Sequence, residues 1–432
     1  MNQTTPFFIL SERSKTVSGS RPLEPIPIEE LKARNKTMKA LTTVNNDELT
    51  ISFPEIREML GNHIREHLQK RLEADREKFW KEDQKFKMRS ECMRKIDQIS
   101  EEMLSDLAPT VSVDFQRTLR IPDNDEDHCL PPGLGSFPLR HVEDFPHKLP
   151  SKWSERGGAM LPIHQSEAMW LSFDCQYPMA LKVGTGKVCA ISGEDWSDGL
   201  SSSPQNYCVL PDQPWLDGYC VEEGVIRQFV AAPLGEGVTV EEQLTGKGEW
   251  GGIQIEAWPL NPHIYWVEGL RRRVDESWDW WLREDGKIIC ASDRGRNYAQ
   301  ESRVCNSPMD EMDMGLAAGG RMKQEIYEDE RKPSDYLLCQ ANRCFVHLCH
   351  ANQWELTTGQ APPNKPPTSE DYSKHGLPWY DYYDEKQVAL SETSKLAGIK
   401  SLKTLDEKLE KKILPDTSDK AQPKVIIKYI NK

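Results

Sequence analysis

Carboxylate residues lie beside tryptophans at several turns in the central part of this sequence. A glycoside hydrolase places two carboxyl groups on opposite sides of a glycosidic bond, and sugar rings stack on indoles, so this combination could form a carbohydrate site. The pattern is not specific, because tryptophans in a β-domain usually pack in its core and acids at turns form caps. The groups are Glu194, Asp195 and Trp196; Trp215 and Asp217; Glu241 and Glu242; Glu249 and Trp250; and Glu256 and Trp258.

Cysteines and histidines form a second group, made of Cys339, Cys344, Cys349, His347 and His350. A zinc site needs paired ligands two to four residues apart, whereas these cysteines are spaced by five. In a strand, Cys344 and His350 would share one face while His347 and Cys349 share the other, which separates the candidate ligands. We therefore predict buried structural cysteines, with no metal and no cofactor, and a metal-dependent hydrolase is only the second alternative function.

Two glycine clusters resemble anion-binding loops. The first, GTGK at 184–187, lacks the upstream glycine and the Ser or Thr after lysine that a phosphate loop needs, so it predicts a hairpin turn. The second, GLAAGGRMKQ at 315–324, could offer backbone amides to an anion, with charge from Arg321 and Lys323. The alternative is that these glycines allow a turn or close packing against a neighbour, which we favour.

No residue pattern dictates a reaction. A GxSxG nucleophile elbow does not occur in the sequence, and sequence distance alone cannot pair a serine or cysteine with a histidine. Convergence of the polar candidates in one cleft would favour an enzyme or a small-ligand protein, and scatter over turns would argue against both. The ligand-binding candidates are Trp215, Asp217, Arg227, Glu241, Gln243, Gln254 and Arg321.

A helical pattern precedes the β-rich part of the chain. Apolar residues recur every four positions from Ile56 to Leu72, and the stripe continues to Met103, which predicts one long amphipathic helix or two between Pro54 and Leu107. Pro109 ends the pattern. His63 and His67 lie four residues apart in this helix without a third ligand, so we expect them to be solvated.

Beyond Val111 the pattern changes to short apolar runs separated by turn glycines. Strands are predicted at 168–173 and 177–183 and in the runs YCVL, GYCVE, GVIRQFVAAPL, GVTVEEQLTG and GGIQIEAWPL. Phe229 should be buried in a strand covered on both faces, because Val225 and Phe229 share one face and Ile226 and Val230 the other. The segments around 268–291 and 314–329 could be short helices or edge strands. The fold class predicted is α+β, mainly β, with an antiparallel β-sandwich-like core, a long N-terminal amphipathic helical segment and a helical C-terminal tail.

Four regions follow from these patterns. Residues 1–50 are rich in Ser, Thr, Pro and Lys and are predicted to be disordered or loosely docked. The amphipathic helical region spans 51–110, and the β-rich core domain spans 111–358. Residues 359–432 form a proline-rich linker and a helical tail.

Charge and composition restrict the partners. The 55 basic and 69 acidic residues give a net charge of −14, which repels nucleic acid and anionic membrane surfaces. The sequence contains no apolar run of about 18 residues that could span a bilayer and no secretory signal. Eleven irregularly spaced cysteines agree with a reducing compartment, so we expect a soluble cytoplasmic protein.

Several motifs, in order, resemble those of a family of functionally uncharacterised microbial proteins from bacteria and some fungi. They include LPPGLGSFPLRHV, LPIHQSEAMWLSF, QPWLDGY followed by RQFVAAPLGEGVTVEEQLTG, and MGLAAGGRMKQEIYED, and the resemblance extends from about Cys129 to about Ile399. It implies a soluble β-rich core. It implies no catalytic residue, because no reaction is established for the family.

The function that these patterns favour is a non-enzymatic binding or scaffold protein that engages a protein partner or itself. The amphipathic surface motivates this prediction, together with the lack of a catalytic constellation in the sequence. A carbohydrate-binding or glycan-active protein is the first alternative, with Trp196, Trp215 and Trp250 as its stacking residues.

Overall fold

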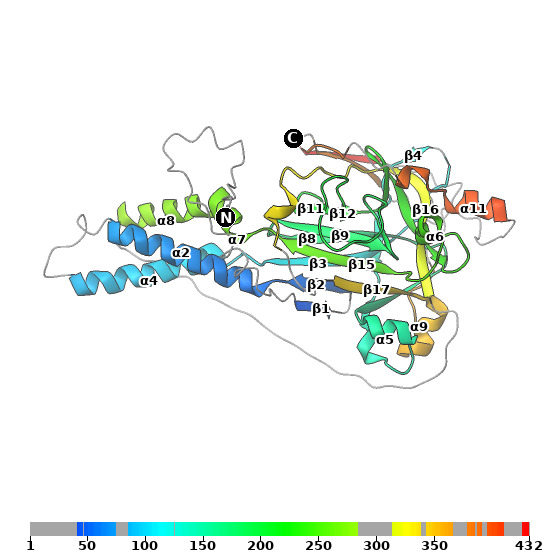
Figure 1. Ribbon diagram of the computed structural model, residues 1–432, viewed down its shortest axis with the longest axis horizontal. Coiled ribbons are helices and arrows are strands. Elements are labelled where there is room, and N and C mark those ends of the chain that lie inside the picture. Colours follow the sequence, from blue (N-terminus) through cyan, green and yellow to red (C-terminus); the bar gives the residue numbers. More distant parts are fainter. Residues whose placement is uncertain are drawn as a thin grey trace, which may run out of the picture.

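The computed structural model describes residues 41–45, 47–74, 85–124, 126–283, 313–337, 343–365, 378–384, 387–390, 395–409 and 426–431. Most of these residues belong to a mainly antiparallel β-sheet with several attached helices (Figure 1). The mainly β, α+β fold class is therefore confirmed. The parallel neighbours are β16 (Asp313–Lys323) with β4 (Asp127–His128), β17 (Arg343–His350) with β7 (Ala159–Ile163), and β18 (Trp379–Asp384) with β19 (Ile426–Asn431).

One half of the sheet begins with the hairpin of β1 (Leu41–Asn45) and β2 (Glu48–Ser52). From β2 the hydrogen bonds continue to β3 (Thr110–Thr118), β8 (Ala168–Cys175), β14 (Val225–Pro233) and β16. Two short strands, β12 (Trp215–Leu216) and β13 (Gly218–Glu222), pair with β8 and β14 respectively. In Figure 1, β16 runs across one end of the stacked strands.

The other half centres on β15 (Ile253–Pro259), which pairs with β17 on one side and with β9 (Met179–Thr185) on the other. Outside β9 lie β10 (Val188–Cys189) and β11 (Cys208–Leu210). The GTGK segment forms the β9–β10 hairpin turn, as predicted, with Gly186 at φ +55°. Two further short strands are β5 (Gly133–Ser136), beside β3, and β6 (Arg140–His141), beside β7.

Strand β14 is covered on both faces, as its sequence predicts. Phe229 has no exposed surface and packs with its ring edge-on to Tyr219, at 4.8 Å between ring centroids. On the opposite face, Ile226 and Val230 are also fully buried, in two smaller apolar clusters. Such burial on both sides explains the continuous apolar run in this strand.

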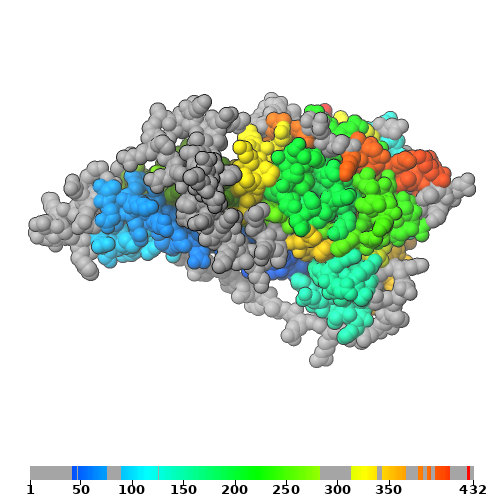
Figure 2. All heavy atoms as spheres, viewed as in Figure 1, coloured from blue at the N-terminus to red at the C-terminus, as the bar shows by residue number. Residues whose placement is uncertain are grey.

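Two insertions into the sheet form a helical arm, which we define as α2 (Pro54–Ala74), α4 (Lys85–Leu104), α7 (Pro262–Tyr265), the π-helical turn η4 (Trp266–Leu270) and α8 (Arg271–Arg283). Helices α2 and α4 are inserted between β2 and β3, and α7 to α8 between β15 and β16. Figures 1 and 2 show α2 and α4 on one side of the β-rich core. The apolar stripe of α2 is buried within the arm, so the helices of the arm pack mainly on one another.

Ion pairs join the two insertions of the arm. Arg71 donates to Asp275 at 2.8 Å and to Asp279 at 2.7 Å. His67 bonds the same Asp275 at 2.7 Å and meets Trp266 edge-on, at 5.3 Å between centroids. The expectation of a solvated His67 is therefore wrong, since its partners come from a helix about 200 residues further along the chain.

Two segments of the chain differ from or decide between the structures expected for them. The segment GVTVEEQLTG, predicted to be a strand, forms helix α6 (Val240–Thr245), while 314–323 forms a strand. The alternation of Val238 and Val240 is too short to outweigh a capping box, in which Thr239 accepts from the Glu242 amide and Glu242 accepts from Thr239. The other helices are η3 (Val142–Asp144), α5 (Ser151–Arg156), η5 (Pro333–Asp335), α9 (Ala351–Thr358), η6 (Leu396–Gly398) and α11 (Leu402–Leu409).

Candidate functional site

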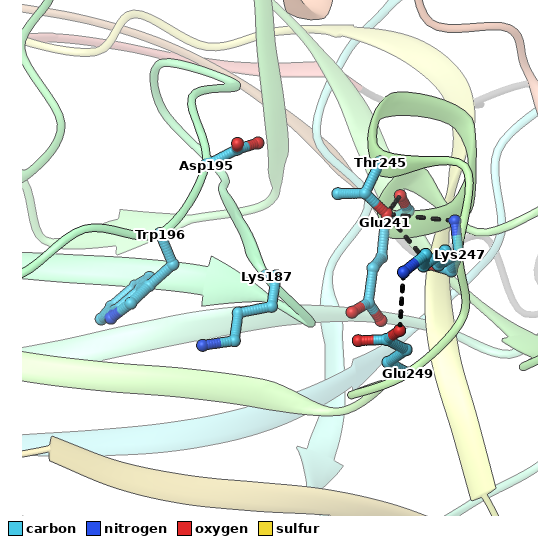
Figure 3. Close-up of a pocket in the computed structure, with 7 residues that line it drawn as sticks. All are labelled: Lys187, Asp195, Trp196, Glu241, Thr245, Lys247 and Glu249. Carbon is cyan, nitrogen blue, oxygen red and sulfur yellow. Dashed lines mark hydrogen bonds and ion pairs between the residues drawn. The ribbon is translucent and has the colours of Figure 1, made fainter.

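A pocket of about 230 Å³ lies between the β9–β10 turn, the loop that follows β10, and helix α6 with its following loop. Figure 3 shows Lys187, Asp195 and Trp196 on one side, facing a group from α6 and the next loop. The charges of its lining are mixed, since two lysines and three carboxylates contribute to it. Of the seven predicted ligand-binding residues, only Glu241 lines this pocket. The facing group is Glu241, Thr245, Lys247 and Glu249.

The carboxylate of Glu241 is used to hold the backbone. It accepts the amide of Gly251 at 2.8 Å and the amide of Trp250 at 3.2 Å. Burial raises the pKa of Glu241, and these backbone hydrogen bonds act in the opposite direction. Gly186 approaches so closely that a Cβ there would lie 2.2 Å from the Glu241 carboxyl carbon. Glu241 thus fastens the β9–β10 turn to the loop at 249–251.

Cations of the protein lie over the indoles near this pocket. Lys187 Nζ lies 3.9 Å from the ring centroid of Trp250, and Arg156 lies 4.0 Å from the same ring. Lys182 Nζ lies 4.6 Å from the ring centroid of Trp196, and the guanidinium carbon of Arg343 lies 5.4 Å from it. A sugar ring that stacked on either indole would have to compete with these cation–π contacts, which disfavours the carbohydrate alternative at this position.

A row of three charges, of which Lys182 and Glu256 are buried, crosses three strands near Trp196. Glu256 of β15 pairs in register with Lys182 of β9 on one side and with Arg343 of β17 on the other. Lys182 has no exposed surface and donates to the carbonyl oxygens of Ser197 and Gly199, the latter at 2.9 Å. Burial raises the pKa of Glu256, opposed by its two cationic neighbours, and burial lowers the pKa of Lys182.

This row was missed by the sequence reasoning. The available signal was a lysine inside the apolar run YPMALKV, since a charged residue in a fully buried strand must find partners. Arg343 adds a hydrogen bond of 2.7 Å to Asp198. Together, Lys182 and Arg343 hold the loop 195–199, which forms one rim of the pocket, against the sheet.

The other predicted site residues lie in separate places. Asp217 is buried and accepts from Gln324 Nε2 at 2.8 Å, and burial raises its pKa to about 7. Its neighbour Trp215 packs edge-on against Tyr382, at 4.9 Å between centroids. A small void near Trp215 and Gln324, about 10 Å³, has room for little more than one water molecule.

Arg227 and Arg321 are cross-strand neighbours on β14 and β16, but they take part in different ion pairs. Arg321 donates to Glu222 and to Asp127, both at 2.7 Å. Arg227 donates to the Gly319 carbonyl oxygen at 3.1 Å and lies 3.9 Å from a carboxylate oxygen of Asp123. These two arginines and the Asp217 pair therefore do not converge on the pocket of Glu241.

Gln243 and Gln254 bind backbone groups. Gln243 accepts the Lys400 amide at 2.8 Å and donates to the Lys400 carbonyl oxygen at 3.1 Å, which joins α6 to the segment before α11. Gln254 is fully buried and donates to the carbonyl oxygen of Gly186 in the β9–β10 turn. Among the seven candidates, Glu241 and Gln254 both approach Gly186, whereas Trp215 and Asp217 both accept hydrogen bonds from Gln324.

Three further buried glutamines also bind backbone groups through their side-chain amides. Each side chain accepts one hydrogen bond and donates two, at distances of 2.8–3.5 Å, and so joins residues 205–217 to residues 324–329. The three residues are Gln205, Gln213 and Gln324. Each amide side chain supplies a donor and an acceptor, as the backbone of a neighbouring strand would. These residues hold two irregular segments together where regular strand pairing ends.

Two of the three cysteines of this group are buried, as predicted. Cys344 and Cys349 lie in β17 and are buried, while Cys339 lies outside the described residues. His347 bonds the Gly157 carbonyl oxygen at 3.0 Å and stacks on Trp153, and burial lowers its pKa to about 4. Within the part of the chain that the structure describes, no group of three or more His, Cys, Asp or Glu residues could hold a metal ion.

The glycines at 315–320 serve close packing, the reading that the sequence favoured. They lie within β16, and a Cβ on Gly320 would lie 2.2 Å from the Pro122 carbonyl oxygen. A Cβ on Gly319 would meet Val230 at 2.6 Å. Gly315 pairs with Ala232 of β14, and Gly319 and Gly320 lie at a register irregularity within the same continuous strand, so this segment is not an anion-binding loop.

Comparison with protein-family models, with curated proteins and with solved structures gives no match to this chain. Among the helices that the structure describes, none is long and apolar enough to cross a membrane.

Proposed function

We propose that this protein is a non-enzymatic binding or scaffold protein whose helical arm engages a protein partner or a second copy of the chain. The observation that carries the proposal is the arm itself. Two insertions, about 200 residues apart in the sequence, pack together beside the sheet and bury their apolar stripes against each other. An element of this kind offers its outer surface for recognition without disturbing the core.

The exposed surface of the arm includes large apolar side chains. Trp280 of α8 is 58% exposed, and Val267 of η4 is 36% exposed. Tryptophans are enriched among the residues that contribute most to protein interfaces, where a partner removes them from water. The candidate polar residues support the same proposal, since Asp217, Glu241, Gln243 and Gln254 hydrogen-bond to the protein itself.

The proposal includes a sandwich-like core, membership of the uncharacterised microbial family that the motifs resemble, and a cytoplasmic location. Strands β9 and β15 are buried along their whole length, which supports a layered core. No disulfide joins the eight cysteines that the structure describes, which supports a reducing compartment.

A matched pair of surface variants tests the arm. Trp280→Ser removes the exposed indole, and Leu356→Ser removes an apolar side chain that is also 58% exposed, on α9 outside the arm. We expect size-exclusion chromatography with light scattering to show a self-associated or partner-bound species for the wild type and Leu356→Ser, and its loss for Trp280→Ser. A wild-type chain that is monomeric at all concentrations and captures the same proteins as Trp280→Ser would overturn the proposal.

A further inference from the structure

A short proline-containing segment lies across the surface of the sheet after α9. Helix α9 ends at Thr358, the C-cap residue Gly359 turns the chain with a φ of +73°, and residues 360–365 read QAPPNK. His164 Nε2 donates to the Pro363 carbonyl oxygen at 3.0 Å, and Arg117 donates to the Asn364 carbonyl oxygen at 2.6 Å. Two consecutive backbone carbonyls are thus bound by side chains from two other elements.

A third contact extends the row of donors. Arg140 of β6 donates to the side-chain oxygen of Gln360 at 2.6 Å. The segment stays near water, because Pro362 and Pro363 are half-buried and the remaining residues from 360 to 365 are exposed. A polyproline II segment makes no internal backbone hydrogen bonds, so its carbonyl oxygens can accept bonds from such donors, and its preformed shape lowers the entropy cost of binding. We call the three donors, Arg117, His164 and Arg140, the strap groove.

The principal donor of the strap groove is held in place without the segment. Arg117 donates to Glu167 Oε1 from Nε at 2.7 Å, and it lies over the Phe137 ring at 5.6 Å. Glu167 is 1% exposed and also accepts the backbone amide of His164 at 2.9 Å. A buried carboxylate therefore orients the guanidinium of Arg117 and fixes the turn that carries His164. Preorganised donors lose little entropy when a ligand binds.

The turn that carries His164 is strained. Ser166 has φ +68°, the one non-glycine residue with positive φ in the described part of the chain. Its buried hydroxyl finds no hydrogen-bond partner among the described residues. A left-handed non-glycine residue and an unsatisfied buried hydroxyl both cost stability, and such costs concentrate at functional sites.

We propose that the strap groove is a docking site for an extended proline-containing segment of another protein. Residues 360–364 of this chain, the resident segment, occupy the same site and compete with that segment. The resident segment is tethered, so its effective concentration is of millimolar order, and an external peptide binds well only when that segment is weakened or outcompeted. This site is separate from the helical arm, so this proposal does not depend on the function proposed for the arm.

The probe is a fluorescently labelled peptide with the sequence QAPPNK, followed by fluorescence anisotropy. In the double variant Pro362→Gly with Pro363→Gly, the resident segment loses its preorganised extended shape, and we expect the probe to bind about tenfold more tightly than to wild type. Adding His164→Ala should remove most of this gain, because the Glu167 contact uses only the backbone amide of residue 164. The matched control, His63→Ala on the arm, should leave binding unchanged.

Absence of saturable binding to the double variant, or binding that His164→Ala does not weaken, would overturn the proposal. A second measurement uses the wild-type chain and so does not depend on folding of the variants. With millimolar peptide, the imidazole resonances of His164 in a nuclear magnetic resonance spectrum should shift, while a peptide with glycines in place of the prolines should shift them less. Unchanged His164 resonances would contradict the proposed site.

Discussion

Replacing Asp217 by asparagine should change how the stability of this protein depends on pH. Asp217 is 4% exposed, and burial raises its pKa from 3.8 to about 7 against the opposing hydrogen bond from Gln324. The native protein therefore holds a proton on this carboxyl over a pH range in which the unfolded chain has released it. Stability from this group is fully present below pH 4 and is lost as the pH rises through about 7.

The size of the stability change follows from how far the pKa of Asp217 is raised. Each pKa unit corresponds to about 1.4 kcal/mol, so a rise from 3.8 to about 7 makes ionised Asp217 cost about 4 kcal/mol in the native state. An asparagine keeps the shape of the side chain, and its oxygen can still accept from Gln324 Nε2. We expect Asp217→Asn and wild type to differ little below pH 4. Above pH 7 the variant should be more stable by up to about 4 kcal/mol.

Urea unfolding followed by tryptophan fluorescence, at a series of pH values from 3.5 to 8.5, measures this effect. The difference in unfolding free energy between variant and wild type isolates Asp217, because the other titrating groups contribute to both proteins. Asp174→Asn is the matched control, since Asp174 is exposed on β8. A difference for Asp217→Asn that stays constant with pH would refute the argument from burial.

Three further predictions concern the core. Phe229→Ala removes a fully buried ring and should lower the free energy of unfolding by about 3 to 5 kcal/mol, and a loss below about 1 kcal/mol would contradict the central position of β14. Gly320→Ala should cost about 1 to 3 kcal/mol in urea unfolding, because its Cβ would meet the Pro122 carbonyl oxygen, whereas Gly269→Ala meets open space and should cost nothing. The His347 imidazole should titrate near pH 4 by nuclear magnetic resonance, and a midpoint near 6.5 would show that it is solvated.

The elements that sequence reasoning placed correctly are those whose local pattern agrees with their final environment. Strand β14 is an apolar run buried on both sides, and the GTGK turn has glycine where φ is positive. Helix α6 was misread because Val238 and Val240 alternate like a strand. Its helical signal lies in Glu242, whose carboxylate accepts the amides of Gly235 and Gly237 at 2.9 Å in addition to the cap.

The candidate site was harder to predict because the partners of its polar residues are distant in the sequence. Gln324 and Asp217 are separated by 107 residues, and His164 and Pro363 by 199. No local pattern specifies such pairs. Glu241 and Gln254 were recognised as polar residues in a β-rich block, but their shared partner is the backbone at Gly186, which the sequence marks only as a turn.

The polar residues that first suggested chemistry supply hydrogen-bond partners for the backbone at the ends of the strands. Strands such as β9 and β15, buried along their whole length, leave irregular segments at their ends, where backbone groups would be buried without partners. Long side chains such as Glu241, Lys182 and Gln213 reach these groups and bind them. Because these side chains are committed to the protein itself, we expect recognition to lie where side chains face outward, on the helical arm and at the strap groove.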